Sequence, residues 1–487
     1  MRATKRILII ALAVMMTVTI AGCGKPSGQT EQTTGGDISG EGTPPETQPE
    51  TAYIDTLEKR DLGEATFTVI GQSNNERQNF YTEEKAGDTI NESIQERDWM
   101  VEERLNVKLN YLALSDRKKV TEAVQKDTAS GDGEYDLVMT SLSDGINTLT
   151  TGGRLVDLTR VPYMSLGSVY WNESMTVNME IGGKLFFTTG PISPQLYQTP
   201  IVMMENKRIA AEYKLEDPYK VVLEGRWTID KLAEVIKDVS HDLNSDGVMG
   251  EQDFWGLIID PTFGNALYVG AGLDARQKTD NGYRLAIGDE DFINLVDKCS
   301  SLFGDRNSVL SNPEGKKDYD LDIFKPGNAL FIDDTVLGVL LMRDMVDDFA
   351  IIPCPKASVE QERYLTTCNT WLPSGVGIPR NGADLETAGL ILETMAVYSY
   401  EKIVPAVYEI TLRGKVSRDA ESYRTLDIIY ENLSFDFVSV FNPGGASDLL
   451  RNSMIGDKEN YASSYNSINK IAQKVLDDFV DAVATLD

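Results

Sequence analysis

The chain has 487 residues and is strongly acidic, because 76 Asp and Glu against 46 Lys and Arg give a formal charge of −30 at neutral pH. A surface with this charge argues against nucleic acid as a partner and against electrostatic docking on an anionic membrane. Once a leader and a linker are set aside, enough chain is left for two or three domains.

The first residues have the pattern of an export signal. Three basic residues precede an apolar run at 7–20 that is too short to span a bilayer as a stable helix. The run closes on IAGC at 20–23, which resembles a bacterial lipobox. That resemblance implies removal of residues 1–22 and a lipid on Cys23, so that the protein sits at the outer face of the cell membrane. The alternative is an ordinary secretory peptide that happens to contain a cysteine.

A linker follows the leader. Residues 24–52 are Gly, Ser, Thr, Pro, Glu and Gln with a single aliphatic side chain, Ile38. Such a segment buries too little apolar surface to offset its ordering entropy. We therefore expect the lipidated cysteine and a disordered tether over 23–54, with the first domain beginning near Asp55. The lipid would be the only contact with the membrane.

Strands and helices alternate after the tether. Apolar patterning predicts strands at 65–70, 107–111 and 135–140, with helices at 90–105 and 118–129 between them. This order is typical of an α/β domain with a mostly parallel, buried sheet.

Polar loops at 71–75 and 140–144 follow two of these strands. Because ligands bind at the carboxyl ends of parallel strands, both loops are candidate binding loops. Further strands are expected at 184–188, 201–205, 329–332, 349–352 and 374–378, and amphipathic helices at 385–398 and 468–483. The second helix is expected to bury an apolar face made of Ile468, Ile471, Val475, Phe479 and Val483.

Residues 242–253, DLNSDGVMGEQD, resemble an EF-hand calcium loop that follows a helix at 229–239 capped by Thr228. Oxygen-bearing side chains stand at loop positions 1, 3 and 5, glycine stands at position 6, and Asp replaces the usual Glu at position 12. The alternative is an Asp/Asn/Gly turn that needs no ion. The expected ligands of a structural calcium ion are Asp242, Asn244, Asp246, Val248 through its carbonyl, and Asp253.

Three cysteines remain beyond Cys23, an odd number. Cys354 and Cys368 can either pair across neighbouring strands or stay buried thiols, as can Cys299. The sequence leaves both readings open.

A set of short motifs runs in order from the leader to residue 422. They are the lipobox, VEERLNV at 101–107, GEYDLV at 133–138, DPY at 217–219, GRWT at 225–228, RDM at 343–345, PCPK at 353–356, TLRGK at 411–415 and RDAES at 418–422. Their order and spacing resemble those of extracellular solute-binding proteins of family 1, the sugar-binding lipoproteins that serve ABC importers in Gram-positive bacteria.

This resemblance implies an α/β, two-lobed, periplasmic-binding-protein-like type II fold with an interlobe ligand cleft. One lobe would take 55–195 plus 355–415, and the other 196–354 plus 416–487 with the calcium loop. It also implies a monomeric protein that catalyses nothing. Its role would be to capture a carbohydrate, expected to be an oligosaccharide, and deliver it to the permease subunits of an ABC transporter.

Saccharides bind by stacking on aromatic rings and by hydrogen bonds to polar side chains. Trp171 and Trp371, each with polar neighbours, are the aromatic candidates, although core packing is the competing role for any tryptophan. Trp99 and Trp227 lie on or beside apolar helix faces and are expected in the core. The polar candidates are Asn74, Asn75, Ser141 and Asp144 at strand ends, and Arg413, for which a surface ion pair is the competing role.

Catalytic motifs are scarce. The only histidine is His241, which excludes HExxH zinc sites and any His-dependent triad elsewhere in the chain, and the chain lacks GxSxG, GxxxxGK[ST] and CxxC. A glycosidase needs only two carboxylates, so a secreted glycan-active enzyme stays an alternative. A lipoprotein that presents its ligand to a sensor is another. The sequence does not fix the size or identity of the ligand.

Overall fold

The structure is a computed structural model in which residues 51–487 form one compact unit. It describes residues 53–72, 80–82, 89–280, 282–312, 316–413, 420–456 and 461–486, with the backbone alone for 409–413 and 420. The leader, Cys23 and nearly all of the tether lie outside the described residues. Within these ranges, no helix combines the length and the apolar character needed to cross a membrane.

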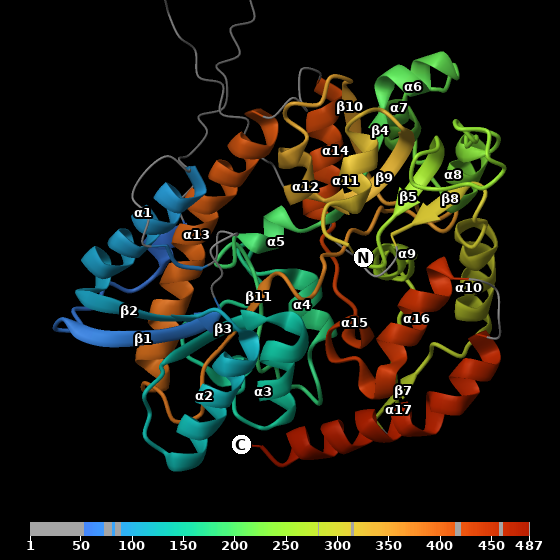
Figure 1. The fold of residues 1–487 in the computed structure, drawn as a ribbon. Helices are drawn as coiled ribbons and strands as arrows, with labels where there is room; N and C mark the ends of the chain where they lie inside the picture. Colours follow the sequence, from blue (N-terminus) through green and yellow to red (C-terminus); the bar gives the residue numbers. More distant parts are fainter. Residues whose placement is uncertain are drawn as a thin grey trace, which may run out of the picture. The chain divides into compact units, whose positions relative to one another are not determined.

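The first sheet has four strands and two crossover helices. Their bounds are β1 Ala65–Gln72, α1 Thr89–Leu105, β2 Val107–Leu114, α2 Arg117–Ser130, β3 Leu137–Ser141 and β11 Ser374–Gly377. The strand order is β11-β3-β1-β2, with β1 parallel to both neighbours and β11 antiparallel to β3 (Figure 1). The predicted alternation of strands and helices and the mostly parallel sheet are confirmed.

Local sequence explains where these elements begin and end. Asp116 caps α2 by accepting the N–H of Lys118, and Gly131 ends the helix with φ 78°, the left-handed conformation that glycine adopts without strain. β3 is buried at all five positions, as expected for an inner strand covered on both faces.

The second sheet has five strands. Their bounds are β4 Ile201–Asn206, β5 Trp255–Ile259, β8 Val309–Ser311, β9 Ala329–Thr335 and β10 Phe349–Pro353. The order is β10-β4-β9-β5-β8; β5 is parallel to β8 and β9, whereas β4 is antiparallel to β9 and β10. The strands expected at 201–205, 329–332, 349–352 and 374–378 are thereby confirmed.

The remaining helices surround the two sheets (Figure 1). They are α3 Asn147–Thr151, α4 Glu173–Asn178, α5 Gln195–Gln198, α6 Lys207–Glu212, α7 Pro218–Leu223, α8 Ile229–Ile236, α9 Phe263–Gly270, α10 Glu290–Phe303, α11 Tyr319–Phe324, α12 Val336–Leu341, α13 Leu385–Arg413, α14 Ala420–Glu431, α15 Phe437–Phe441, α16 Ala446–Ile455 and α17 Tyr461–Ala484. A short hairpin, β6 Arg276–Thr279 and β7 Gly282–Leu285, stands apart from both sheets.

Backbone pairs tie together the segments that connect the two sheets. Pro200 and Cys368 form an antiparallel bridge, Ile201 N–H donates to Thr367 O at 2.8 Å, and Val336 N–H donates to Pro200 O at 3.0 Å. The end of β9 therefore lies beside the connection that leads back to β11. The first sheet's strands fall within 65–141 and 374–377, and the second's within 201–353; the predicted lobe boundaries themselves stay a prediction.

Three local expectations are wrong. Residues 184–188 form only isolated bridges, because Gly182 and Gly183, both at positive φ, fold the chain back on itself. Trp99 is 59% exposed, whereas Trp227 is buried as expected. In α17, Ile471 is 63% exposed. The backbone at Gly444 approaches Ala472 so closely that an added Cβ would collide with it, which places the Ala472 face of α17 against the protein and leaves the neighbouring Ile471 outside.

Four carboxylates, which we call the carboxylate cluster, gather at the end of β5 and β9: Asp260, Asp320, Asp333 and Asp334. The N–H of Asp260 donates to Asp333 Oδ1 at 2.8 Å. Burial, with neighbouring carboxylates, raises the pKa of Asp320 to about 8 and of Asp334 to about 7, and that of Asp333 well above its usual value.

The pH dependence of folding should report this cluster. A carboxyl whose pKa is about 8 when folded and about 4 when unfolded holds its proton better in the folded state, so its stabilisation is complete below about pH 4 and is lost as pH rises to about 8. We expect Asp320→Asn to gain stability relative to wild type between pH 5 and pH 8, measured by urea unfolding. Asp322→Asn, an exposed carboxylate on the same helix, is the control. Parallel pH profiles for wild type and Asp320→Asn would contradict this.

Candidate functional site

The loop after β3 places one predicted residue, Asp144, at the surface. A single π-type turn, Leu142–Ile146, follows the strand, and Asp144 within it has φ 57° and ψ 13°. This left-handed conformation is one that Asp tolerates better than most residues. The Asp144 side chain is 69% exposed and available to a ligand.

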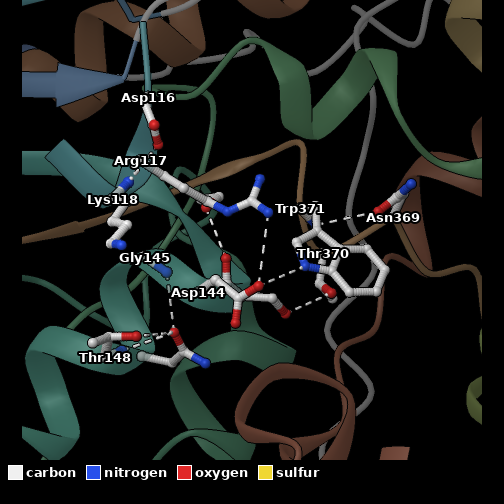
Figure 2. Close-up of polar contacts among 12 residues, drawn as sticks. Asp116, Arg117, Lys118, Asp144, Gly145, Thr148, Asn369, Thr370 and Trp371 are labelled. Carbon is white, nitrogen blue, oxygen red and sulfur yellow. Dashed lines mark hydrogen bonds and ion pairs between the residues drawn. The ribbon is translucent and has the colours of Figure 1, made fainter. Parts of the chain in front are cut away.

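Asp144 and Trp371, which are distant in sequence, lie side by side. The indole N–H of Trp371 donates to Asp144 Oδ2 at 3.3 Å, and the Trp371 backbone N–H donates to Asn369 Oδ1 at 3.2 Å (Figure 2). Trp371 belongs to the segment that runs from the bridge at Cys368 into β11, which fixes its position. Its side chain is half-buried.

Two arginines complete this group. Arg117, the first residue of α2, lies with Nη2 3.7 Å from Asp144 Oδ2, and Arg451 of α16 holds its guanidinium carbon 5.5 Å from the centre of the Trp371 ring. We call Arg117, Asp144, Trp371 and Arg451 the Asp144–Trp371 site. It combines an aromatic ring with carboxylate and guanidinium groups, the chemistry that recognises an apolar sugar face and its hydroxyls.

Sequence reasoning missed both arginines. Arg117 follows the end of β2, so the strand-end argument that selected Asp144 would have found it too. Arg451 had no signal of its own, because it reaches the site only through the packing of α9 on α16. That contact is close: a Cβ added at Gly264 would collide with the Arg451 carbonyl oxygen.

Trp171 is a core residue, which corrects its prediction as a ligand contact. It is 3% exposed, and its indole N–H donates to Glu393 Oε2 at 3.0 Å. The same carboxylate accepts the Tyr170 hydroxyl at 2.6 Å and the Ser165 N–H at 3.0 Å. Burial raises the pKa of Glu393, and these donors oppose that rise. Trp171 thus supplies a hydrogen bond to Glu393, a buried carboxylate of α13.

The other predicted residues divide into one correction and three that stay predictions. Ser141 is buried and its hydroxyl donates to Ser143 O at 2.8 Å, so the structure places it in the core. Asn74 and Asn75 lie outside the described residues. Arg413 ends α13, and its side chain also lies outside the described part.

The candidate calcium loop is closed at its base. His241 and Phe254 form an antiparallel bridge with stacked rings, which brings loop positions 1 and 12 together. The Asp242 carboxylate accepts the N–H of Ser245 at 2.6 Å and of Gly247 at 2.8 Å. Gly247 has φ 83°, the sharp turn that an EF-hand loop needs at position 6.

The side chains expected to bind calcium form hydrogen bonds within the loop. Asn244 donates its amide to Asp246 Oδ2 at 2.9 Å, and the buried Asp253 accepts the N–H of Gly250 at 2.6 Å. Within the described residues, no three His, Cys, Asp or Glu side chains converge as a metal site would require. The backbone therefore has the shape of a calcium loop, and the ion stays a prediction.

Cys299, Cys354 and Cys368 are all buried free thiols in this structure. Cys354 and Cys368 lie near different carbonyls, Ile201 O at 3.5 Å and Leu196 O at 3.4 Å. Burial raises the pKa of each thiol, which makes all three poor nucleophiles.

Comparison with known proteins identifies the fold. No protein-family model matches the chain, and no curated protein sequence matches it either. Solved structures do match across nearly their whole length.

Three of these structures are representative. A cyclo/maltodextrin-binding protein complexed with maltotetraose is 12% identical and has a TM-score of 0.54, covering 88% of this chain and 98% of its own. The galacto-N-biose-/lacto-N-biose I-binding protein of the Bifidobacterium longum ABC transporter, in complex with lacto-N-biose, is 14% identical and has a TM-score of 0.54; the match covers 87% of this chain and 99% of that protein. An ABC substrate-binding protein of Listeria monocytogenes in complex with cycloalternan is 12% identical and has a TM-score of 0.51; the match covers 86% of this chain and 99% of that protein.

At such low identity the similarity is one of fold. It confirms the fold class that the sequence motifs implied. The chain has the two-lobed α/β fold of the sugar-binding proteins of ABC transporters.

Proposed function

We propose that this protein is an extracellular solute-binding lipoprotein that captures a carbohydrate, in particular an oligosaccharide, and delivers it to an ABC importer. The observation that carries the proposal is the Asp144–Trp371 site. It joins a half-buried indole, a carboxylate and two guanidinium groups at the ends of β3 and of the connection into β11. The shared fold supports it, since the matched structures are described as binding proteins. We assign the chain no catalytic role.

The site suits a two-lobed binder because its residues come from both sides of the connections between the sheets. Asp144 lies in the turn after β3 and Arg117 begins α2, both in the first sheet's part of the chain, whereas Arg451 lies on α16, which packs against α9 beside the second sheet. A ligand that contacts both sides favours the closed form, because it shifts an open–closed equilibrium only by its greater affinity for one state. Trp371, between the two groups, would stack on the sugar ring.

Replacing the stacking residue should weaken glycan binding strongly. Truncating a stacking Trp in a binding site costs about 2–4 kcal/mol, so we expect Trp371→Ala to lower glycan affinity by at least about 30-fold in calorimetry. Trp99→Ala removes an exposed tryptophan of α1 and should leave affinity unchanged.

Small-angle scattering provides the second readout. The radius of gyration should fall when the glycan binds, because the lobes close on it. If Trp371→Ala binds the glycan tightly and the glycan does not change the radius of gyration, then neither the proposed site nor the closure of the lobes is correct.

We also propose that the 242–253 loop holds a structural calcium ion. At calcium one hundred-fold above the dissociation constant, occupancy stabilises the fold by about 2.7 kcal/mol. Chelator should lower the melting temperature of wild type, and Asp246→Ala should abolish that response. Glu251→Ala, at a loop position that supplies no ligand, should keep it. Metal-stripped wild type that melts at the same temperature with and without added calcium would leave only an ion-free turn.

The membrane anchor rests on Cys23. We expect Cys23→Ser to lose incorporation of a radiolabelled fatty acid and to appear in the growth medium, because a protein whose only membrane contact is its lipid is released without it. Cell fractionation measures this release. Equal membrane retention of wild type and variant would count against a lipoprotein.

A further inference from the structure

Glu205, in the second sheet, is a buried acid whose position the fold does not explain. It lies on β4, the strand between β10 and β9, and all six positions of this strand are buried. Glu205 is 2% exposed, and its Oε2 has no hydrogen-bond partner. A carboxylate in such a place costs free energy unless a proton, a donor or a cation compensates it. Its Oε2 therefore needs a partner that the described side chains do not supply.

A small cavity lies against this carboxylate. Its other walls come from the start of α7, from Trp227 and from α8, and they are mostly apolar, with Pro218, Val221 and Val235 among them. The volume of about 20 Å³ gives room for one guest of the size of a water molecule. We call this space the Glu205 cavity.

The cations at the wall of the cavity already have carboxylate partners. Lys231 lines the cavity, and its Nζ bonds to Glu234 Oε1 at 2.7 Å. Glu216 is the second acid of the wall, and Arg226 pairs with it at 2.7 Å. The charge of Glu216 is thus compensated, whereas that of Glu205 is not.

The protonation of Glu205 reflects the same shortage of partners. Burial raises the pKa of its carboxyl to about 8; the neighbouring Asp217 adds to this rise, and Lys207 opposes it. Asp217 accepts the N–H of Tyr219 at 2.9 Å, and the Nζ of Lys207 lies 4.9 Å from the centre of the Tyr219 ring. At neutral pH the carboxyl therefore holds a proton, which a bound cation would replace.

The cavity suits a monovalent cation better than a divalent metal ion. A divalent ion needs several oxygen ligands, and no three His, Cys, Asp or Glu side chains converge within the part of the chain that the structure describes. One uncompensated carboxylate matches one positive charge. The indole of Trp227 adds an aromatic wall, and aromatic rings attract cations.

We propose that the Glu205 cavity binds a monovalent cation of the size of a water molecule, ammonium or potassium, and that this ion stabilises the fold around the second sheet. None of the cavity's lining residues belongs to the Asp144–Trp371 site, so this site and the carbohydrate site are independent. On binding, the cation takes the place of the carboxyl proton, which passes to the buffer.

Melting curves in matched salts test the proposal. The purified protein is melted at pH 8 in equal concentrations of ammonium, potassium or choline chloride, since choline is too large for the cavity. With ammonium or potassium at ten times its dissociation constant, we expect a melting temperature about 1–2 °C higher than in choline chloride. The larger of the two shifts identifies the ion. Equal melting temperatures in all three salts would overturn the proposal.

Proton competition gives the response a direction with pH. Because the cation binds the ionised carboxylate, the shift should be smaller at pH 6, where Glu205 holds its proton, than at pH 8. A shift of equal size at both values would mean that the ion binds a group other than Glu205.

Variants locate the ion. Glu205→Gln removes the charge and should melt at the same temperature in all three salts. Val235→Met fills the cavity while leaving Glu205 in place, so it should lose the response as well. Glu212→Gln changes an exposed carboxylate of α6 outside the cavity and should keep the wild-type shift. A shift that survives in Glu205→Gln would overturn the proposal; if that variant does not fold, Val235→Met decides in the same way.

Crystals soaked in thallium(I), which has a size and charge similar to those of potassium, show the position directly. We expect an anomalous scattering peak beside the Glu205 carboxylate of the wild-type protein and no such peak in Glu205→Gln. Thallium peaks at other places only would contradict the assignment.

Discussion

Backbone hydrogen bonds between the segments that connect the two sheets fix where the segment that carries Trp371 lies. The bridge between Pro200 and Cys368 and the bond from Val336 to Pro200 hold three stretches of chain side by side. They bring the end of β9 against the segment that carries Trp371. Because main-chain pairing is insensitive to side-chain identity, the binding residues can differ between proteins of this fold while the frame stays the same. The matched structures, each only 12–14% identical to this chain, share its fold and are described with different sugars.

The elements that the sequence predicted correctly are those whose patterns are local. β1, β2 and β3 and the helices between them follow from period-two and helical spacing of apolar residues, and caps such as Thr228 and Asp116 mark where helices begin. Asp144 was found because a polar residue after a buried strand has few structural reasons to be there. Such signals need no knowledge of the rest of the chain.

Residues assigned wrongly depend on partners far away in sequence. Trp171 has polar neighbours that suggest exposure, yet its indole bonds to Glu393, more than two hundred residues later. The carboxylate cluster was invisible for the same reason, since Asp260, Asp320 and Asp333 are unremarkable until the sheet brings them together. Long-range packing decides each of these cases.

The role of Trp371 at the binding site is the central claim, and the indole N–H resonances of the five tryptophans test it most directly. In a ¹⁵N–¹H spectrum, the Trp371 signal is identified by its loss in Trp371→Phe. Because its N–H points to the exposed Asp144, we expect a bound glycan to shift this signal while those of the buried Trp171 and Trp227 stay in place. A glycan that saturates the protein and leaves the Trp371 signal unmoved would contradict the assignment of the site.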